Sequence, residues 1–533
     1  KHNNTMAKHK QAIPRIAVKS IQYNPILPYQ EIDECQVGGS GFFVDGKSIG
    51  LSETPGTRTV LTNFHVIQDT HDRKCALHFP ANGSDALTAH VKFVVPRLDI
   101  AVLEVRPRDH PLWVGNNSGL HVTDFIDSIP NLPVNPNPIA CNNQKVYAYG
   151  YPNGTDDIQV CEGNCSGRDM GMMQISMSLN GGNSGGPLML ANKVVGVNTA
   201  TVGDSEGLAL CVSIHQVVRL FRYWYRDDQE GPIIKIPSWG ISFDITTPSY
   251  LTYHGVDHAI QGCNIKRLIP HGAADESNIK VGDIVTGIES GGKRYNVNNS
   301  GMVRVPWTNK LVPIDNTEFI LGLDPDDIQF SLFRWTSKTS MKAGVPVTPT
   351  PLNFQVREVF PQWEPVDYCI LGGCVFMNLT MNHLEPPEEE DEEPLCTNPV
   401  PLISFIGETM NMESAVVVTY IPPQSHVSTN KSLKTFDRIL KCQNKKVRNA
   451  SHLASIVRDH VTASYNKRSA SAKDKFIVLE TPDGRYYLDI EQLRLHEETD
   501  AMTRPFYPTE KCLLFGHAQA VKTTKTRKRR RTQ

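Results

Sequence analysis

One short stretch of the sequence has the residue types of a nucleophile with an adjoining anion-binding site. Residues 181–187 read Gly-Gly-Asn-Ser-Gly-Gly-Pro, with Ser184 at the centre. Glycine reaches backbone conformations that other residues avoid, so such a bend can expose the hydroxyl and aim several backbone N–H groups at one point. A cluster of N–H groups of this kind stabilises the oxyanion of an acyl-transfer reaction. Many glycine-rich turns hold a serine without any chemistry, so the interpretation needs partner residues.

Two upstream residues have the types that would activate this serine. A serine hydroxyl is a poor nucleophile without a base, and His65 lies in the apolar stretch 61–67. Asp99 lies at the start of an apolar run, where a buried carboxylate needs a partner. Taken alone, the histidine reads as a core residue and the aspartate as a turn cap. The order His65, Asp99, Ser184 matches the chymotrypsin-type triad, so we predict that these residues form one.

The segments around these positions resemble the HtrA/Deg branch of the chymotrypsin-type proteases. In the order of that family, they are Gly39-Ser40-Gly41-Phe42, Thr62-Asn63-Phe64-His65-Val66, Leu98-Asp99-Ile100-Ala101-Val102-Leu103, Tyr147-Ala148-Tyr149-Gly150-Tyr151-Pro152, Gly182-Asn183-Ser184-Gly185-Gly186-Pro187-Leu188 and Val195-Gly196-Val197-Asn198-Thr199. The resemblance implies a serine endopeptidase whose chemistry needs no cofactor and no metal.

The same resemblance assigns roles to the three residues. Ser184 attacks the scissile carbonyl, His65 transfers the proton to the leaving amine, and Asp99 orients the imidazole. The backbone N–H groups of Gly182 and Ser184 are expected to bind the oxyanion.

The resemblance also places Ser178, Asn198 and Thr199 in the specificity pocket. Trypsin-like enzymes carry Asp six residues before the nucleophile, and here that position is Ser178. Cleavage after Arg or Lys is therefore not favoured, and small or medium apolar residues are expected before the scissile bond (P1).

Length and composition set wider limits. The chain has 533 residues, with 54 Lys and Arg against 56 Asp and Glu, so its formal charge is −2. This length suggests roughly three to four domains, and the charge balance excludes a globally basic nucleic-acid-binding protein and an acidic disordered chain. No long apolar run occurs, so neither a membrane span nor an apolar leader is expected. We therefore expect a reducing compartment, in which most of the twelve cysteines are free thiols.

Short segments rich in Val, Ile and Tyr alternate with turn residues and predict an all-β first domain. With the resemblance, the expected fold is mainly β: a chymotrypsin-like double β-barrel protease domain followed by two PDZ-like α/β domains. Expected domains are an N-terminal extension (1–35), the protease domain (36–230), PDZ-like domain 1 (236–345), PDZ-like domain 2 (352–510) and a basic C-terminal tail (511–533). In the first domain, strands are predicted at 59–67, 100–105, 145–149, 187–190 and 194–198, and a helix at 212–225.

Residues 238–345 resemble a PDZ domain of the HtrA type. Ser238-Trp239-Gly240-Ile241 is similar to its carboxylate-binding loop, and residues 279–285 are similar to its Gly-Asp turn and strand. This implies that Trp239, Gly240 and Ile241 receive a peptide C-terminus while the peptide adds as a strand. A polar insertion at 288–313 departs from a compact PDZ domain.

Residues 352–510 resemble the divergent second PDZ domain of plant-type Deg proteases, through the segments 368–376 and 437–449. That module serves assembly in the group, and family relatives assemble from trimers, so a homo-oligomer is expected. A helix is predicted at 451–460, with Ser451 as its N-cap. Six consecutive acids, 388–393, lie in the segment 385–394; their mutual repulsion favours an exposed loop, and binding of a basic partner is the alternative.

Cys161 and Cys165 lie in a polar stretch, 161–171, where the family has a regulatory activation loop. A metal pair or a redox pair are alternatives, but a lone C-x₃-C spacing is a weak metal signal, and plain loop cysteines are favoured. Cys369 and Cys374 are interpreted as structural.

The last twelve residues contain seven Lys or Arg and resemble a nuclear-localisation run or a nucleic-acid patch. The predicted location is the nucleus or nucleolus, with the cytoplasm as the alternative. The plain interpretation of the basic residues is a solvated tail that no partner binds. Expected partners are unfolded or extended protein substrates. Two rivals remain open: a catalytically silent PDZ scaffold or chaperone, and a processing protease with one dedicated target.

Overall fold

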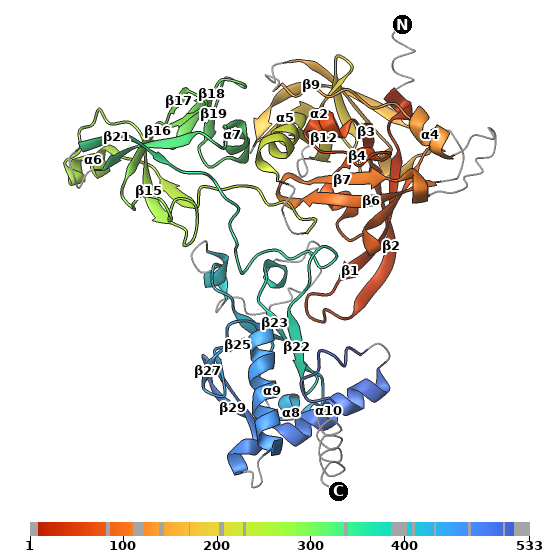
Figure 1. Cartoon of the computed structure of the whole chain (residues 1–533), viewed down its shortest axis with the longest axis vertical. Coiled ribbons are helices and arrows are strands. Elements are labelled where there is room, and N and C mark those ends of the chain that lie inside the picture. Colours follow the sequence, from red (N-terminus) through yellow and green to blue (C-terminus); the bar gives the residue numbers. More distant parts are fainter. Residues whose placement is uncertain are drawn as a thin grey trace. The chain divides into compact units, whose positions relative to one another are not determined.

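The computed structural model describes residues 9–80, 86–109, 122–137, 143–169, 171–201, 207–226, 231–334, 339–384, 402–407, 411–430, 433–466, 471–504 and 507–515. The chain divides into two compact units. The first contains residues 1–21 and 34–352, and the second contains residues 22–33 and 353–533. Figure 1 labels their helices and strands. The predicted acidic run 388–393 and the basic run 522–531 lie outside the described residues.

The first sheet contains seven strands in the order β2-β1-β5-β6-β7-β4-β3. They are β1 (Arg15–Tyr23), β2 (Glu31–Ser40), β3 (Phe42–Val44), β4 (Arg58–Thr62), β5 (Lys74–His78), β6 (Ala86–Val95) and β7 (Ile100–Val105). Every residue of β7 is buried, because its apolar sequence lies between β4 and β6. The one acid in it, Glu104, accepts a hydrogen bond from Arg106 Nε at 2.7 Å, which satisfies its carboxylate.

The second sheet closes into a six-stranded barrel, in the order β10-β13-β12-β11-β8-β9. Its strands are β8 (Lys145–Gly150), β9 (Gln159–Asp169), β10 (Met172–Ser176), β11 (Pro187–Leu190), β12 (Lys193–Thr201) and β13 (Ala209–Ser213). Alternate apolar side chains such as Val146, Ala148 and Leu188 fill its core. The mainly β, chymotrypsin-like fold is thus confirmed, and the strands predicted at 145–149, 187–190 and 194–198 fall within β8, β11 and β12.

A helix closes the barrel domain, as predicted. Residues Ile214–Arg219 form α5, which continues as a π-helical turn over Leu220–Trp224. Val217, Val218 and Phe221 are buried in the core that the helix shares with the first sheet. The apolar residues recur at helical spacing, so one face of the helix is covered by the domain.

The PDZ-like α/β domain of the first unit follows this helix. Its sheet has the order β14-β15-β16-β20-β21, and β17 also pairs with β16. The elements are β14 (Ile241–Asp244), α6 (Pro248–His254), β15 (Cys263–Leu268), β16 (Ile284–Ser290), β17 (Lys293–Asn296), β18 (Met302–Val305), β19 (Lys310–Pro313), α7 (Thr317–Gly322), β20 (Ile328–Arg334) and β21 (Thr339–Pro346). The insertion at 288–313 forms β17 and the hairpin β18–β19.

Helix α7 packs against α5 and the β9–β10 hairpin, so the PDZ-like domain is held to the barrel. Arg168 Nη1 pairs with Glu318 Oε1 at 2.7 Å, and their side chains are only 5% and 1% exposed. Burial raises the pKa of Glu318, and the Arg168 guanidinium opposes this shift. Arg219 Nε and Trp224 Nε1 both donate to the carbonyl of Leu321, at 2.8 and 3.2 Å. A buried ion pair and a shared carbonyl therefore fix this contact.

The second unit has two four-stranded sheets, in the orders β22-β23-β24-β25 and β27-β26-β28-β29. Its elements are β22 (Tyr368–Leu371), β23 (Cys374–Asn378), β24 (Val416–Tyr420), α8 (His426–Thr429), β25 (Arg438–Ile439), β26 (Lys441–Cys442), β27 (Lys445–Lys446), α9 (Ala450–Asn466), β28 (Phe476–Thr481), β29 (Gly484–Asp489) and α10 (Ile490–Thr503). Helix α9 lies against β22 and β23 (Figure 1) and buries Leu453, Ile456 and Val457. This unit has its own hydrophobic core.

Two features of the second unit differ from or add to the sequence analysis. Helix α9 begins at Ala450, and the Asn449 side chain accepts the His452 N–H at 2.7 Å, so the predicted N-cap Ser451 is wrong. The buried Glu497 carboxylate accepts the N–H groups of Gly372, Leu514 and Phe515. Burial raises the pKa of Glu497 to about 7, although these hydrogen bonds oppose the shift.

Three further predictions need correction. Residues 15–23 form β1 of the first sheet, and residues 22–33 belong to the second unit, so 1–35 is not a separate extension. The strand predicted at 59–67 ends at Thr62, because residues 64–67 form a helix. Cys161 and Cys165 lie on β9 rather than in a loop, and Cys165 is disulfide-bonded while Cys161 is free.

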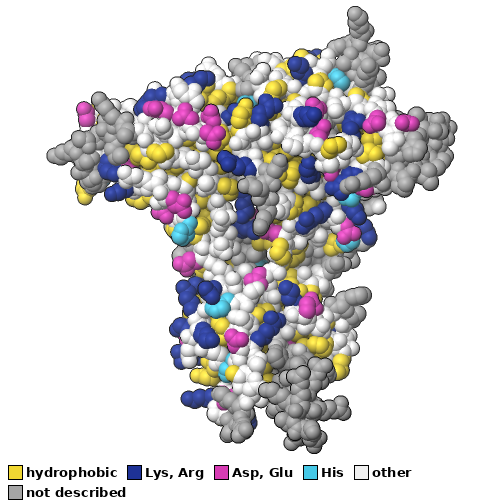
Figure 2. Space-filling model, in the orientation of Figure 1, with side chains coloured by type: hydrophobic (Ala, Val, Ile, Leu, Met, Phe, Trp, Pro, Cys, Tyr) yellow, Lys and Arg dark blue, Asp and Glu magenta, His cyan; other side chains and the backbone are white. Residues whose placement is uncertain are grey.

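The surface carries charges of both signs. On the face drawn in Figure 2, Lys and Arg side chains lie among Asp and Glu side chains, in keeping with the formal charge of −2. None of the described helices is long and apolar enough to cross a membrane.

The Arg168–Glu318 pair gives a stability prediction. Replacing Arg168 by Ala leaves a buried carboxylate unpaired, which costs about 3–5 kcal/mol of unfolding free energy. The matched control is Lys145→Ala, because Lys145 and Glu162 form an exposed ion pair, 55% and 53% accessible. That change should cost less than about 1 kcal/mol. Urea denaturation of the two variants measures the difference, and equal midpoints would contradict the prediction.

Candidate active site

His65 and Asp99 come from adjacent loops at the end of the first sheet. His65 lies on the one-turn helix α3 (Phe64–Ile67), directly after β4, and Asp99 lies between a 3₁₀ turn (Pro96–Leu98) and β7. Asp99 Oδ2 lies 2.8 Å from His65 Nδ1, and Asp99 Oδ1 accepts the His65 backbone N–H at 2.9 Å. Both oxygens of the Asp99 carboxylate therefore contact His65. This fixes the orientation of the imidazole ring and leaves its Nε2 atom outside the contact.

The backbone of Asp99 is held in an unusual conformation. Its φ of 51° and ψ of 47° place it in the left-handed region, where Asp is one of the few residues that occur with any frequency. The Asn63 side chain donates from Nδ2 to the Asp99 carbonyl at 2.8 Å and to Thr199 Oγ1 at 3.0 Å. Asn63 thus connects the loop that carries the carboxylate with strand β12 of the barrel.

Ser184 lies in the turn that precedes β11 and is braced from both sides. Its carbonyl accepts the Ser40 N–H at 2.8 Å, and its Oγ donates to the Thr199 carbonyl at 2.9 Å. Within the described residues, no hydrogen bond joins Ser184 to His65. The sequence analysis therefore named the three residues, and the structure pairs His65 with Asp99 while Ser184 is turned toward β12.

The predicted oxyanion donors are free for a ligand. Within the described part of the chain, the N–H groups of Gly182 and Ser184 have no hydrogen-bond acceptor. The Gly181 carbonyl accepts the Asn153 N–H at 2.6 Å. Because the peptide unit is planar and trans, the N–H of Gly182 points away from that contact. Two unpaired N–H groups that are separated by one residue can bind a single oxyanion.

Gly182 is required by both its conformation and its surroundings. Its φ is +94°, and a Cβ at this position would lie 2.3 Å from the Tyr151 carbonyl oxygen. Ser40 Oγ donates to the Gly182 carbonyl at 2.7 Å and accepts the Tyr151 N–H at 3.0 Å. Ser40 therefore holds the glycine turn against the strand end that carries Tyr151.

The three predicted specificity residues have different places. Ser178 is exposed. Asn198 is fully buried, and its Nδ2 donates to the Tyr149 carbonyl at 3.3 Å, so it does not line an open pocket as predicted. Thr199 is buried beside Ser184 and binds both Ser184 and Asn63. Its role as a brace was missed by the sequence analysis, and so were those of Ser40 and Asn63, although all three lie in the quoted motifs.

The predicted carboxylate-binding loop is partly committed to the core of its domain. Trp239 is 1% exposed, and its Nε1 donates to the Ile314 carbonyl at 2.6 Å. Gly240 has a φ of +68°, and its N–H donates to Ser238 Oγ at 3.3 Å. Ile241 begins β14, which is an edge strand of its sheet. The part of this segment that remains available to a peptide is therefore the edge of β14 that pairs with no other described strand.

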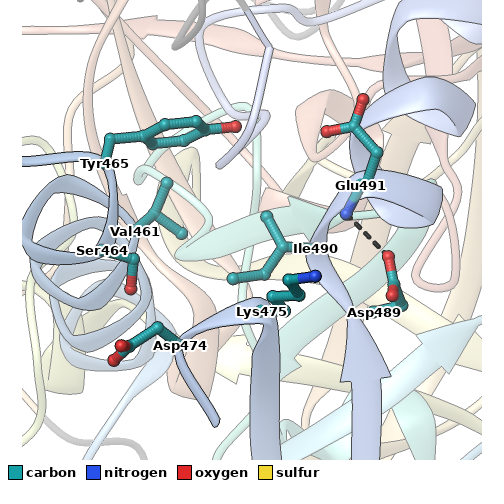
Figure 3. A pocket seen from close by; sticks show the side chains of 8 residues that line it. All are labelled: Val461, Ser464, Tyr465, Asp474, Lys475, Asp489, Ile490 and Glu491. Carbon is teal, nitrogen blue, oxygen red and sulfur yellow. Dashed lines mark hydrogen bonds between the residues drawn. The ribbon is translucent and has the colours of Figure 1, made fainter. Parts of the chain in front are cut away.

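A cavity of about 410 Å³ in the second unit has different chemistry. It is lined by the end of α9, the 3₁₀ turn Ala472–Lys475 that precedes β28, the last residue of β29 and the start of α10 (Figure 3). Asp489 Oδ1 accepts the Glu491 N–H at 2.9 Å, so this carboxylate caps α10. Among the described residues that line the cavity, none is a histidine that could act on Ser464. Across the described residues, no group of three or more His, Cys, Asp or Glu is placed to hold a metal ion.

Comparison with known proteins places this arrangement among proteases. A trypsin-like peptidase domain matches residues 39–197. "Putative protease Do-like 12, mitochondrial" of Arabidopsis thaliana is 24% identical over 388 residues, which cover 70% of this chain and 67% of that protein. "Putative protease Do-like 3, mitochondrial" of the same plant is 23% identical over 500 residues, covering 87% and 75%. These names give no support to the predicted nuclear location.

Among solved structures, the serine endoprotease from Yersinia pestis has 20% sequence identity and a TM-score of 0.41. The match covers 66% of this chain and 98% of that one.

The geometry of Gly182 gives a prediction about activity. In Gly182→Ala the new Cβ would collide with the Tyr151 carbonyl and displace the N–H, so kcat/KM for a protein substrate should fall by about 10²-fold or more. The control is Gly56→Ala, because Gly56 also has a positive φ, of +76°, but has no atom within 4 Å of its Cβ position. That variant should lose about 1–2 kcal/mol of stability and keep its activity. Wild-type kcat/KM in Gly182→Ala would contradict the prediction.

Proposed function

We propose that in this chain, a member of the HtrA/Deg family of serine endopeptidases, Ser184, His65 and Asp99 hydrolyse peptide bonds through an acyl-enzyme. The observation that carries the proposal is the two-point contact of Asp99 with His65, at 2.8 and 2.9 Å, next to the turn that presents Ser184. A carboxylate held in this way fixes the tautomer of the base and stabilises the imidazolium that forms during the reaction.

The proposed reaction begins with a rotation of Ser184. Its Oγ leaves the Thr199 carbonyl and donates to His65 Nε2, which removes the proton as Oγ attacks the scissile carbonyl. The N–H groups of Gly182 and Ser184 receive the oxyanion. His65 then gives its proton to the leaving amine, and water releases the acyl group by the same route in reverse. Strain and metal ions have no part in this scheme.

The PDZ-like domains are proposed to capture peptides and to assemble the homo-oligomer, and not to take part in the reaction. The free edge of β14 can accept an extended peptide as an added strand, with its C-terminus at Trp239, Gly240 and Ile241. The substrates proposed are unfolded or extended proteins, and a trimer-based homo-oligomer is the proposed assembly. Because α7 binds Arg168 of the β9–β10 hairpin, this domain is mechanically linked to the barrel.

One observation favours a second candidate function. Among the described residues, Ser184 donates to Thr199 and not to His65, and a chain that kept this contact with a substrate bound would be a catalytically silent peptide-binding scaffold or chaperone. The two candidates differ in whether the serine can reach the base when a substrate is bound.

The first experiment compares wild type with Ser184→Ala on unfolded casein. Loss of the nucleophile should reduce cleavage by about 10³-fold or more, with an unchanged unfolding midpoint. The control is Ser166→Ala, an exposed serine on β9, which should cleave as wild type does. Cleavage by all three proteins would refute the assignment, and cleavage by none would favour the scaffold.

A second experiment concerns the residue before the scissile bond. Ser178 supplies no negative charge at the position where trypsin-like enzymes carry Asp, so small or medium apolar P1 residues should be preferred over Arg and Lys. Mass-spectrometric profiling of cleavage sites in a peptide library measures this preference. A strict requirement for Arg or Lys would overturn the proposed pocket.

A further inference from the structure

A cavity of about 670 Å³ adjoins the proposed oxyanion donors on the side of the β1–β2 hairpin. Its lining includes Gly181 and Gly182 at one end, residues 36–39 of β2, and Arg15 and His78. Its described lining contains neither the triad residues nor the predicted specificity residues. Its position beside Gly182 makes it a candidate for binding part of a substrate.

The contacts of Ser184 identify which part of a substrate this would be. Thr199, on the specificity side, accepts the Ser184 hydroxyl, whereas Ser40, which follows the cavity-lining residues of β2, donates to the Ser184 carbonyl. The cavity and the predicted specificity strand therefore lie on opposite flanks of Ser184. If the acyl part of a substrate lies along β12, the leaving peptide lies along β2.

The backbone of the cavity suits an extended peptide. Strand β2 is at the edge of the seven-stranded sheet, so its outer side can pair with one more strand. Val37 is 39% exposed and offers an apolar contact there. Gly38 and Gly39 carry no side chains that would block a close approach of another backbone.

Among the described lining residues of the cavity, Arg15 carries the only permanent charge, because burial and Arg15 itself lower the pKa of His78. Arg15 on β1 and His78 on β5 are cross-strand neighbours, and none of the described lining residues is acidic. Arg15 Nη1 donates to the Gly154 carbonyl at 2.8 Å, which orients the guanidinium, while its Nε and Nη2 bind no other described residue. The acid near it, Asp156, lies 3.5 Å away with a side chain that is 93% exposed, so solvent screens that pair. The Arg15 side chain itself is only 27% exposed.

We infer that this cavity is the subsite for the leaving peptide and that Arg15, next to His78, selects substrates with Asp or Glu within the first few residues after the scissile bond. The inference rests on the proposed function, because it needs a scissile bond at Ser184. A guanidinium that is oriented and partly shielded from water binds a carboxylate more strongly than an exposed one does. Arg15 thus acts as a specificity residue: it contacts the leaving peptide and none of the reacting atoms.

The test uses quenched fluorescent peptides that share one apolar P1 residue and differ at the first four positions after the scissile bond. Asp, Asn or Lys is placed at each position in turn. Wild type should show a kcat/KM about tenfold higher for Asp than for Lys at one or two of these positions. Arg15→Gln should remove this difference, and Arg15→Lys should keep part of it.

Two controls separate this inference from its premise. Lys19→Gln removes the same charge from an exposed position of the same strand, outside the cavity lining, and should keep the preference. A peptide p-nitroanilide has no residues after the scissile bond, so Arg15→Gln should hydrolyse it at the wild-type rate. If wild type cleaves the peptides without a charge preference, or if Arg15→Gln keeps it, the inference is wrong while the proposed function stands. If wild type cleaves neither substrate class, both are wrong.

Discussion

Hydrogen bonds between the two β-layers of the protease domain hold the candidate site together. Asn63, at the end of the first sheet, binds the Asp99 carbonyl and Thr199 of the barrel. Ser40 binds the Ser184 and Gly182 carbonyls from the same side. His65 follows a strand of the first sheet and Ser184 precedes a strand of the barrel, so their separation depends on these few bonds. Because the groups are buried, loss of one partner would leave an unsatisfied polar atom, and this makes the arrangement specific.

The orientation of Ser184 follows from a competition between two acceptors. The Thr199 carbonyl is fixed on β12 and accepts the hydroxyl at 2.9 Å, whereas His65 is 46% exposed at the side chain and can bond to water instead. In the proposed reaction, a rotation about the serine Cα–Cβ bond exchanges one acceptor for the other. A bound substrate would exclude water from His65 and so favour the state in which the serine faces the base.

The PDZ-like domain of the first unit is joined to the barrel by polar contacts that the two domains share. The Arg168–Glu318 pair is buried, and the Leu321 carbonyl of α7 accepts hydrogen bonds from both Arg219 and Trp224. Removing two charges from water costs several kcal/mol, so the pair stabilises the contact only while both partners stay in place. A movement of α7 would therefore be felt at the β9–β10 hairpin. The contact thus links the sheet that begins with β14 to the barrel that carries Ser184.

The sequence by itself determined the elements with strong local signals, and it named His65, Asp99 and Ser184 as the candidate residues of the site. Strand β7 and helix α5 were predicted closely because apolar residues dominate β7 and recur at helical spacing in α5, and the glycines around Ser184 are required by local backbone geometry. Tertiary structure decided the rest. The end of β4 at Thr62, the inclusion of β1 in the first sheet and the burial of Asn198 depend on partners distant in the sequence, whereas the capping of α9 by Asn449 is a local contact with His452. The tertiary structure also decides whether the Ser184 hydroxyl bonds to Thr199 or to His65, because a hydroxyl bonds to whichever acceptor the fold brings within reach.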